Sequence, residues 1–339
     1  MTLPMTLLVT FFIVIALVPA LVRVASPRSL VAVPGEHRGH SAPTPLVGGI
    51  AVMVAFAAGV LIGVDDIPAG LGVAMLLLAV FGTLDDRFTL PFWVRFLVQI
   101  AAAVVLVEDG SRLVTLGALF SEDVVYLGTW EYGLTVFAIV GVINAVNMID
   151  GMDGLMAGVV IVALSAVVIA AYPASTRETQ AALVMIAALL GFFMFNARLP
   201  GRGQVTTFMG DGGSMPVGVF MAWILVNGSQ PPESIIAPVA AIWFLMLPLF
   251  DTVGVMLRRL LRGRSPFAAD RKHTHHYLQA RTGSVTWTVL TLICIAVAGA
   301  CAGLLAMKPG VPESIMFYGF LVLFGVYLVV MERYGRTAR

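Results

Sequence analysis

The stretch LTVFAIVGVINAVNMIDGMDGLMAGVVIVALSAVVIAA, residues 134–171, contains two apolar runs joined by a short polar turn. Its only charged residues are Asp150 and Asp153, and both lie in that turn. A helix that crosses a lipid bilayer needs about 20 predominantly apolar residues. The stretch therefore predicts two membrane-spanning helices that are joined at one face of the membrane.

The whole chain shares this apolar character. Of its 339 residues, 59% are hydrophobic and only 12% are charged, whereas soluble globular domains carry about 25% charged residues. So little charge cannot cover a water-facing surface, which excludes a soluble enzyme, a disordered protein and a coiled coil. The formal net charge of +1 argues against nucleic acid as a partner. The composition predicts an all-α polytopic protein embedded in a lipid bilayer.

Apolar stretches of about 17 to 25 residues are candidate spanning helices, and eleven of them follow one another along the chain. We expect a single integral membrane domain over residues 1–339, because the longest segment between spans is too short for a separate domain. The predicted spans are residues 3–22, 46–64, 67–84, 91–107, 133–149, 154–172, 181–197, 210–226, 236–257, 285–306 and 313–332.

Basic residues are distributed unevenly between the segments that join these spans. All of the 20 Lys and Arg residues except Arg112, Arg177 and Lys308 fall on one side. Cytoplasmic loops carry an excess of Lys and Arg, so this side is predicted to be cytoplasmic, with the N-terminus outside and the C-terminus inside. All histidines and the acids with Gly-rich or His-rich neighbours lie on the same side. We therefore expect the active site at the cytoplasmic face.

The run FGTLDD, residues 81–86, ends in two adjacent carboxylates. Asp85 and Asp86 repel each other at a helix end and normally require a cation, an arginine or a proton nearby. They are candidate site residues for that reason. A solvated helix end beside Arg87 is the alternative interpretation.

The run NAVNMIDGMDGL, residues 144–155, follows an apolar span. Asn144, Asn147 and Asp150 recur every three residues and so share one helix face, while Asp153 lies in the turn that follows. Polar groups at the end of an apolar span are costly unless they bind something. Oxygen ligands from Asp and Asn suit Mg²⁺, although simple capping of the helix end is an alternative.

The run FMGDGGS, residues 208–214, opens another predicted span. Glycines at the start of a helix allow backbone amides to approach an anion, and a neighbouring acid can hold the counter-ion. Gly210 and Asp211 are the candidates here. Most Gly-rich turns of this kind merely begin a helix, so the motif is weak evidence by itself.

The longest cytoplasmic segment is also the most basic, and it contains DRKHTHHYLQ, residues 270–279. Its histidines fit no standard zinc spacing and have no cysteine nearby. Beside so many cations they are better suited to donating hydrogen bonds to phosphate. Contact with anionic lipid headgroups is the alternative. Arg262 and Lys272 are further cations of this segment. The candidate phosphate-binding residues are His273, His275, His276, Arg258, Arg259 and Arg264.

Asp251 lies about two turns inside the ninth predicted span, where an acid is a functional candidate by default, although a structural partner is equally open. Together, five segments bring acids, asparagines, histidines and arginines to one membrane face. Acids that hold a divalent cation and basic groups that hold phosphates are what phosphoryl transfer requires. At a bilayer surface, this pattern predicts a lipid phosphate and a soluble nucleotide as the two substrates.

In this order, the motifs resemble the signatures of the polyprenyl-phosphate N-acetylhexosamine-1-phosphate transferases, in glycosyltransferase family 4. PTPLVGG, residues 43–49, is similar to their N-terminal motif, so the resemblance covers residues 43–279. Within the family, RRLLRGRSPFAADRKHTHH, residues 258–276, looks more like the branch that uses UDP-N-acetylglucosamine. It looks less like the branch that uses UDP-MurNAc-pentapeptide.

The resemblance implies that the phosphate of undecaprenyl phosphate attacks the sugar-linked phosphorus of UDP-N-acetylglucosamine. UMP is released and a lipid-linked pyrophosphoryl sugar remains. The resemblance also implies Mg²⁺, with Mn²⁺ as an alternative, held by Asn147 and Asp211. It implies a multi-pass protein of the bacterial inner membrane, and analogy alone suggests a homodimer.

Roles for the other motif residues follow from the same resemblance. Asp85 and Asp86 would lie by the carrier phosphate, with Asp85 as a base or an orienting group. Asp150 and Asp153 would order the nucleotide side of the site. The three histidines of DRKHTHHYLQ would contact phosphate or sugar.

Two positions depart from the family pattern. Arg95 stands where relatives often have a phosphate-binding lysine, which keeps the charge but changes the geometry of its donors. Glu36-His37-Arg38 replaces a more basic run before the PTPLVGG motif. The first departure concerns the role of Arg95, and the second concerns early recognition of the carrier lipid.

Other donors and one non-enzyme function stay open. The donor could be another UDP-N-acetylhexosamine or UDP-MurNAc-pentapeptide, and the glycan served could be O-antigen, teichoic acid or an arabinogalactan type. A secondary transporter would place ionisable groups near the bilayer midplane in repeated halves, whereas here only Asp251 is at depth and no internal repeat occurs. An intramembrane aspartyl protease is disfavoured because Phe208 replaces the first glycine of its GxGD motif.

Overall fold

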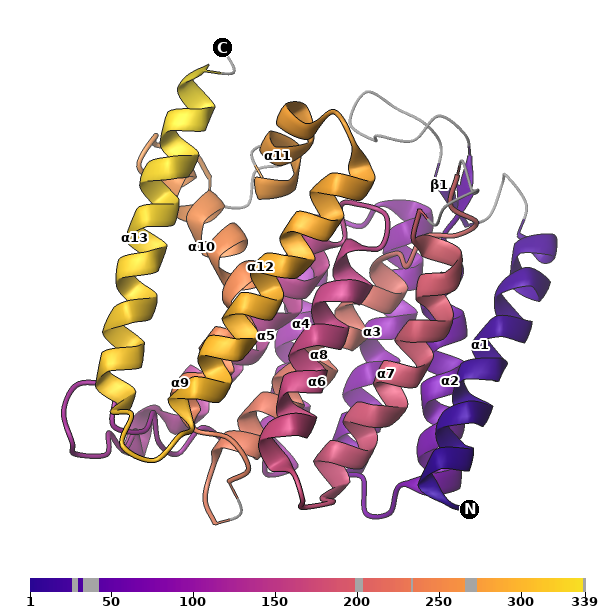
Figure 1. The fold of residues 1–339 in the computed structure, drawn as a ribbon. Helices are drawn as coiled ribbons and strands as arrows, with labels where there is room; N and C mark the ends of the chain where they lie inside the picture. The colour runs from indigo at the N-terminus through magenta and orange to yellow at the C-terminus, as the bar shows by residue number, and fades with distance from the viewer. Residues whose placement is uncertain (26–29, 33–42, 199–203, 233, 266–272, 338–339) are drawn as a thin grey trace.

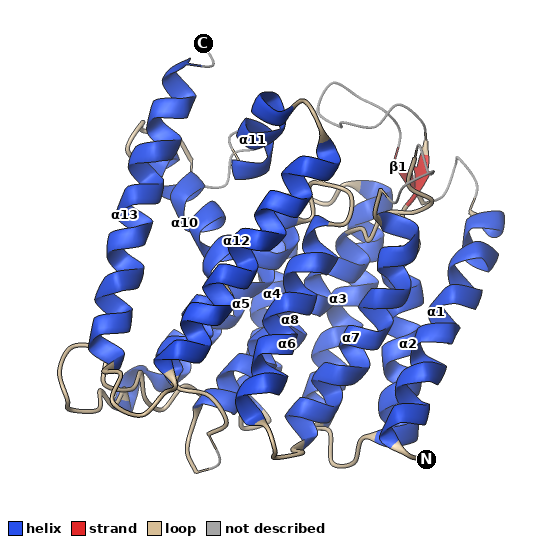
Figure 2. Ribbon diagram, viewed as in Figure 1, coloured by secondary structure: helices blue, strands red, loops and turns tan. Residues whose placement is uncertain are grey.

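The computed structural model describes residues 1–25, 30–32, 43–198, 204–232, 234–265 and 273–337, and they form a bundle of helices (Figures 1 and 2). The predictions made for Glu36, His37, Arg38 and Lys272 lie outside the described residues. In chain order the helices are α1 (Leu3–Val24), α2 (Gly48–Gly63), α3 (Ala69–Phe88), α4 (Phe92–Glu108), α5 (Glu131–Ile149), α6 (Leu155–Ala171), α7 (Arg177–Asn196), α8 (Asp211–Ser229), α9 (Pro238–Phe244), α10 (Met246–Leu260), α11 (Thr274–Thr282), α12 (Val285–Ala306) and α13 (Glu313–Thr337).

Each of the eleven predicted apolar segments contains a helix, and the ninth contains two. The chain bends by 77° between α9 and α10, around Leu245. Within the described residues, six helices are long and apolar enough to cross a membrane, or seven if the bent pair forms one span. Two further apolar helices, α2 and α6, are shorter. The fold is therefore that of an all-α membrane protein, while the count of eleven spans stays a prediction.

Helix α8 occupies the centre of the bundle. Nearly every one of its residues is buried, including Trp223 and Phe220, and it packs against α3 and α5. Gly82 of α3 and Gly218 of α8 lie where a side chain would strike the backbone of the neighbouring helix. Small residues at these crossings bring the three helices close together. The start of α8 is thereby held against the ends of α3 and α5.

Two GxxxG pairs have the packing role that their spacing indicates. Gly59 and Gly63 of α2 face Thr10 and Thr6 of α1. Gly299 and Gly303 of α12 face the α9–α10 region, where Trp243 is their shared neighbour. Both pairs are helix contacts rather than ligand sites.

The ends of the helices define two faces of the bundle. At one face, called the polar face here, α3 and α5 end and α8 and α11 begin (Figure 1). At the other face, Thr115 pairs with Tyr126 across a small hairpin. Arg112, Arg177 and Lys308 lie in or beside the connections of that opposite face. The segregation of charge is therefore present in the fold, and the cytoplasmic assignment of the polar face stays a prediction.

The PTPLVGG motif supports the start of α8 through backbone hydrogen bonds. It includes β2 (Thr44–Pro45), which pairs with β1 (Val31–Ala32). The amide of Phe208 donates to the carbonyl of Pro45 at 2.9 Å, and the amide of Gly49 donates to the carbonyl of Met209 at 3.0 Å. The motif therefore fixes the loop that leads into FMGDGGS.

Candidate active site

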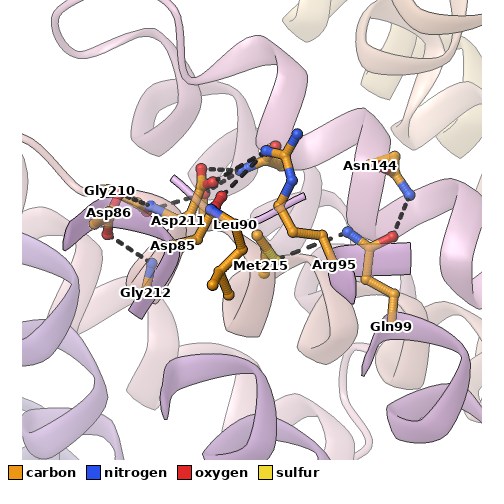
Figure 3. A network of polar contacts seen from close by, with 12 residues as sticks. Asp85, Asp86, Leu90, Arg95, Gln99, Asn144, Gly210, Asp211, Gly212 and Met215 are labelled. Atoms are coloured by element: carbon orange, nitrogen blue, oxygen red, sulfur yellow. Dashed lines mark hydrogen bonds and ion pairs between the residues drawn. The ribbon is translucent and has the colours of Figure 1, made fainter. Parts of the chain in front are cut away.

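Asp86 caps helix α8 from a different helix. Its Oδ1 accepts the backbone amide of Asp211 at 2.9 Å, and its Oδ2 accepts the amide of Gly212 at 3.1 Å (Figure 3). A carboxylate is favoured at this position because the first amides of a helix are unpaired and carry partial positive charge. The sequence predicts that the amides of the Gly-rich turn approach an anion, and in the structure that anion is the carboxylate of Asp86.

Gly210 makes this contact sterically possible. It precedes α8 with φ of +71°, a conformation that favours glycine. A Cβ at this residue would collide with Oδ2 of Asp86. The first glycine of GDGG is therefore required for two reasons: its backbone has a positive φ, and the carboxylate of Asp86 leaves no space for a side chain.

Arg95 joins the two remaining carboxylates of this region. Its Nη1 lies 3.1 Å from Oδ2 of Asp85 and 3.6 Å from Oδ2 of Asp211. Asp85 is buried in the last turns of α3, and its Oδ1 also accepts the amide of Leu90 at 2.5 Å. The guanidinium therefore offsets the repulsion between two acids that come from distant parts of the chain (Figure 3).

The two asparagines of α5 face the same region one helical turn apart. Asn147 donates to Oδ1 of Asp211 at 2.7 Å and to the hydroxyl of Ser214 at 2.8 Å. Asn144 donates to Oε1 of Gln99 at 2.7 Å, one turn beyond Arg95 on α4. The structure thus brings Asn144 and Asn147 to the cluster that contains Asp85, Arg95 and Asp211.

Asp150 lies in the turn after α5, close to the same carboxylates. Burial, followed by the charges of Asp211, Asp86 and Asp153, raises the pKa of Asp150 well above its ordinary value. A group in this environment either holds a proton or needs a cation beside it. Positive charge placed beside this turn would therefore stabilise the ionised form of Asp150.

Asp153 has a dedicated partner. Its Oδ2 accepts from Nε of Arg198 at 2.7 Å, which ties the α5–α6 turn to the end of α7. Both side chains are partly shielded from solvent. The structure therefore places Asp153 in an ion pair beside the cluster.

The three histidines begin helix α11 and lie over the α5–α6 turn. The ring centroids of His275 and His276 are 4.2 Å apart, and the rings of His273 and His275 are stacked with centroids 5.6 Å apart. A side chain on Gly151 would run into the ring of His275. Burial, with a smaller contribution from His276, lowers the pKa of His275 to about 3. His275 is thus packed against the α5–α6 turn, in surroundings that favour its neutral form.

Asp251 and the arginines of the basic segment occupy different environments. Asp251 is only 2% exposed and contacts His273 and Thr274. Arg258 and Arg259 are buried in the last turns of α10. Arg264 follows α10 and is exposed.

A long groove leads away from the cluster along the helices. Its volume is about 860 Å³, and it is lined largely by apolar side chains of α4, α5, α8, α9 and α10. Helix α5 contributes residues from Phe137 to Met148, about 17 Å of helix at 1.5 Å per residue. Arg95, Asn147, Arg259 and His273 lie at its polar end. The groove is an amphiphilic site, apolar along its length and cationic at one end.

Two residues of the site carry no recognisable motif signal. Gln99 is buried in α4 and contacts Asn144. Asn196 is buried at the end of α7, where it accepts the amide of Gly154 at 2.8 Å and donates to the carbonyl of Thr207 at 2.9 Å. The only available signal is a lone amide within an apolar run, which is weak by itself.

The donor set fits a magnesium ion that is shared with a substrate. Among the described residues, no three His, Cys, Asp or Glu side chains converge as a complete cage. Mg²⁺ is usually held by one or two carboxylates, and water and phosphate oxygens complete its coordination. Asp85 and Asp211 already face one cationic nitrogen, and Asn147 contacts Asp211. Hard oxygen donors are therefore available where a divalent cation is needed.

Comparison with known proteins supports the resemblance of the motifs. Residues 68–229 match the model of glycosyl transferase family 4. The chain is 37% identical to the undecaprenyl-phosphate alpha-N-acetylglucosaminyl 1-phosphate transferase of Escherichia coli (strain K12), over 94% of this chain and 88% of the relative. With the same coverage it is 35% identical to the Yersinia pestis enzyme of that name. It is 30% identical to a probable undecaprenyl-phosphate N-acetylglucosaminyl 1-phosphate transferase of Bacillus subtilis (strain 168), again with this coverage.

These matches extend across the helices that carry the cluster and the groove. The names of the relatives describe transferases of a sugar phosphate, which is the class of enzyme that the motifs predict at a membrane surface. The chain therefore belongs to glycosyl transferase family 4 and is a multi-pass membrane phosphotransferase.

Proposed function

We propose that this protein transfers N-acetylglucosamine 1-phosphate from UDP-N-acetylglucosamine to undecaprenyl phosphate. An oxygen of the carrier phosphate forms a bond to the sugar-linked phosphorus, and the bond from that phosphorus to the bridging oxygen of UMP breaks. The products are UMP and undecaprenyl-pyrophosphoryl-N-acetylglucosamine. The carrier and the transferred group in the names of the relatives, undecaprenyl phosphate and N-acetylglucosaminyl 1-phosphate, support this assignment.

One observation carries the proposal: the carboxylate and arginine cluster lies at the end of an apolar groove. A prenyl phosphate has a matching shape, with a long apolar chain and a single charged end. The apolar lining of the groove can replace the lipid around such a chain without exposing it to water, because lipid tails and apolar side chains are about equally apolar. The phosphate would then meet Arg95 and Arg259, which line the groove.

The residues of the cluster suit charge neutralisation and positioning. When bound by Asp211 and Asn147, Mg²⁺ would neutralise the pyrophosphate oxygens of the donor. Arg95 orients the carrier phosphate, and Asp85 in turn orients Arg95 at 3.1 Å. A phosphate monoester is already mostly dianionic at pH 7, so we assign Asp85 an orienting role rather than that of an essential base. Asp150 lies on the nucleotide side of this arrangement.

The proposal includes the cellular setting. The chain acts as a single membrane domain of the bacterial inner membrane, with eleven spans and the polar face toward the cytoplasm, where nucleotide sugars are available. Its product begins the synthesis of a cell-envelope polysaccharide. A homodimer is proposed by family analogy.

The test is radiolabel transfer from UDP-N-acetylglucosamine to undecaprenyl phosphate by purified protein, with and without EDTA. We expect a lipid product and equimolar UMP that both disappear with EDTA and return with added Mg²⁺. If a lipid product forms from UDP-MurNAc-pentapeptide or another UDP-N-acetylhexosamine but not from UDP-N-acetylglucosamine, the proposed donor is wrong and the reaction class stands. No product from any of these donors, in a preparation that is folded, would refute the proposal.

A further inference from the structure

Asp251 is a buried carboxylate whose hydrogen bonds join two elements. Its Oδ1 accepts from the amide of Thr274 at 2.7 Å and from the Thr274 hydroxyl at 2.6 Å. Its Oδ2 lies 2.6 Å from Nδ1 of His273. The side chain is only 3% exposed, so both oxygens are used within the protein. Asp251 therefore cannot itself meet a substrate.

The ring of His273 is fixed at one edge by its contact with Asp251. With Nδ1 held by Asp251, Nε2 is the nitrogen left for other contacts. His273 also lines the polar end of the groove, whereas Asp251 lies behind it. A carboxylate on Nδ1 orients the imidazole and stabilises positive charge on the ring when Nε2 meets an anion.

The surroundings of His273 indicate the kind of ligand. Arg95 and Arg259 line the same groove, and Asn147 joins them at its polar end. Cationic and amide donors at the mouth of an apolar groove suit the phosphate of an amphiphile better than the neutral hydroxyls of a sugar.

We propose that Asp251 is a positioning residue that holds His273 so that Nε2 binds the phosphate of the prenyl carrier. The inference rests on the proposed function for the identity of the carrier. It deepens that function by assigning one histidine of the three to the lipid substrate. His275 packs on Gly151 instead, so the three histidines are not interchangeable.

The experiment measures the preference of purified, detergent-solubilised protein for farnesyl phosphate over farnesol, by binding titration without nucleotide sugar. His273→Asn keeps an amide nitrogen near the position of Nδ1 and removes the group that faces the groove. Asp251→Asn leaves the imidazole but takes away the carboxylate that orients it. Tyr327→Phe is the matched control, because its hydroxyl contacts Thr274 at 2.9 Å but not His273.

We expect both test variants to bind farnesyl phosphate about tenfold to a hundredfold more weakly, as for loss of a charged hydrogen bond. Farnesol affinity should stay within about twofold, since the apolar contacts are unchanged. Tyr327→Phe should bind both ligands like the wild type. The double variant Asp251→Asn with His273→Asn should bind no more weakly than His273→Asn alone, since Asp251 acts through that ring.

Three results with the variants would overturn the inference. These are an unchanged affinity of His273→Asn for farnesyl phosphate, an equal loss for farnesol, or losses that multiply in the double variant. A wild-type protein that binds the phosphate no better than the alcohol would overturn it as well. The binding titrations require no turnover. A protein that transfers no sugar phosphate, but whose preference for farnesyl phosphate over farnesol depends on Asp251 and His273, would refute the proposed reaction and leave this inference standing.

Discussion

The backbone amide of Asp211 donates a 2.9 Å hydrogen bond to the side chain of Asp86, so that one acid of the cluster caps the helix that presents the other. Asp86 accepts the amide of Gly212 as well. Its neighbour Asp85 instead contacts Arg95. Two adjacent acids with the same sequence signal thus have different physical roles.

Replacement of Asp86 by Ala should lower the stability of the protein together with its activity. Loss of a helix N-cap costs about 0.5–2 kcal/mol, and the unfolding temperature in detergent would fall. Asp86→Asn should be intermediate, because an amide oxygen can keep only one of the two backbone contacts. An Asp86→Ala protein that is inactive but as stable as the wild type would show that Asp86 acts on a substrate instead.

Gly210→Ala should be strongly destabilising and inactive. The backbone at φ +71° and ψ 171° lies in a region that is essentially restricted to glycine and adds about 1–3 kcal/mol of strain for a residue with a Cβ, and the methyl group would displace Asp86. Gly72→Ala is the matched control, since Gly72 lies in α3 with open space around it. Thermal unfolding of the two variants should differ by several degrees, and equal unfolding temperatures would contradict the steric argument.

Asp211→Asn should abolish transfer and the stabilisation of the protein by Mg²⁺. In the wild type, Mg²⁺ at ten times its Kd should add about 1.4 kcal/mol of stability, measured as a rise in unfolding temperature that EDTA reverses. Asp153→Asn should keep this rise, because Asp153 is paired with Arg198. If Asp211→Asn responds to Mg²⁺ as the wild type does, Asp211 is not a magnesium ligand.

Acidification should destabilise the protein partly through His275. Its pKa of about 3 in the folded state lies below the ordinary value of 6.5, so the unfolded chain binds the proton first as pH falls. The stabilising effect is complete above pH 6.5 and decreases as pH falls toward 3, by about 2 kcal/mol at pH 5. His275→Asn should lose less unfolding free energy than the wild type between pH 7.5 and pH 5. Identical pH dependence would mean that His275 is accessible to protons.

Much of the helical architecture was predictable from local sequence. Each apolar segment forms a helix because a backbone in lipid must satisfy its own hydrogen bonds. The break at Leu245 has a local signal that the prediction of one continuous span over residues 236–257 did not use. Pro248 has no amide hydrogen to donate to the carbonyl of Phe244, and a proline inside a helical pattern breaks or kinks the helix. The bend separates α9 from α10 and thus shapes the groove.

The site was predictable as a set of residues but not as a set of contacts. The motifs correctly indicated that Asp85, Asn147 and Asp211 would gather at one face of the bundle. They gave no indication of Gln99 or Asn196, since a single amide in an apolar run looks the same whether it packs or binds.

The sequence by itself determined the helices, the segregation of charge and the family, because these depend on apolar length, local composition and the order of motifs. Only the tertiary structure decided that Asp86 caps α8 and that Asp251 holds His273. Such pairings join residues far apart in the chain, and the packing and rotation of whole helices decide which of several equivalent acids meets which partner. Chemical type is a local property of sequence, whereas the partner of each charged group depends on the geometry of the bundle.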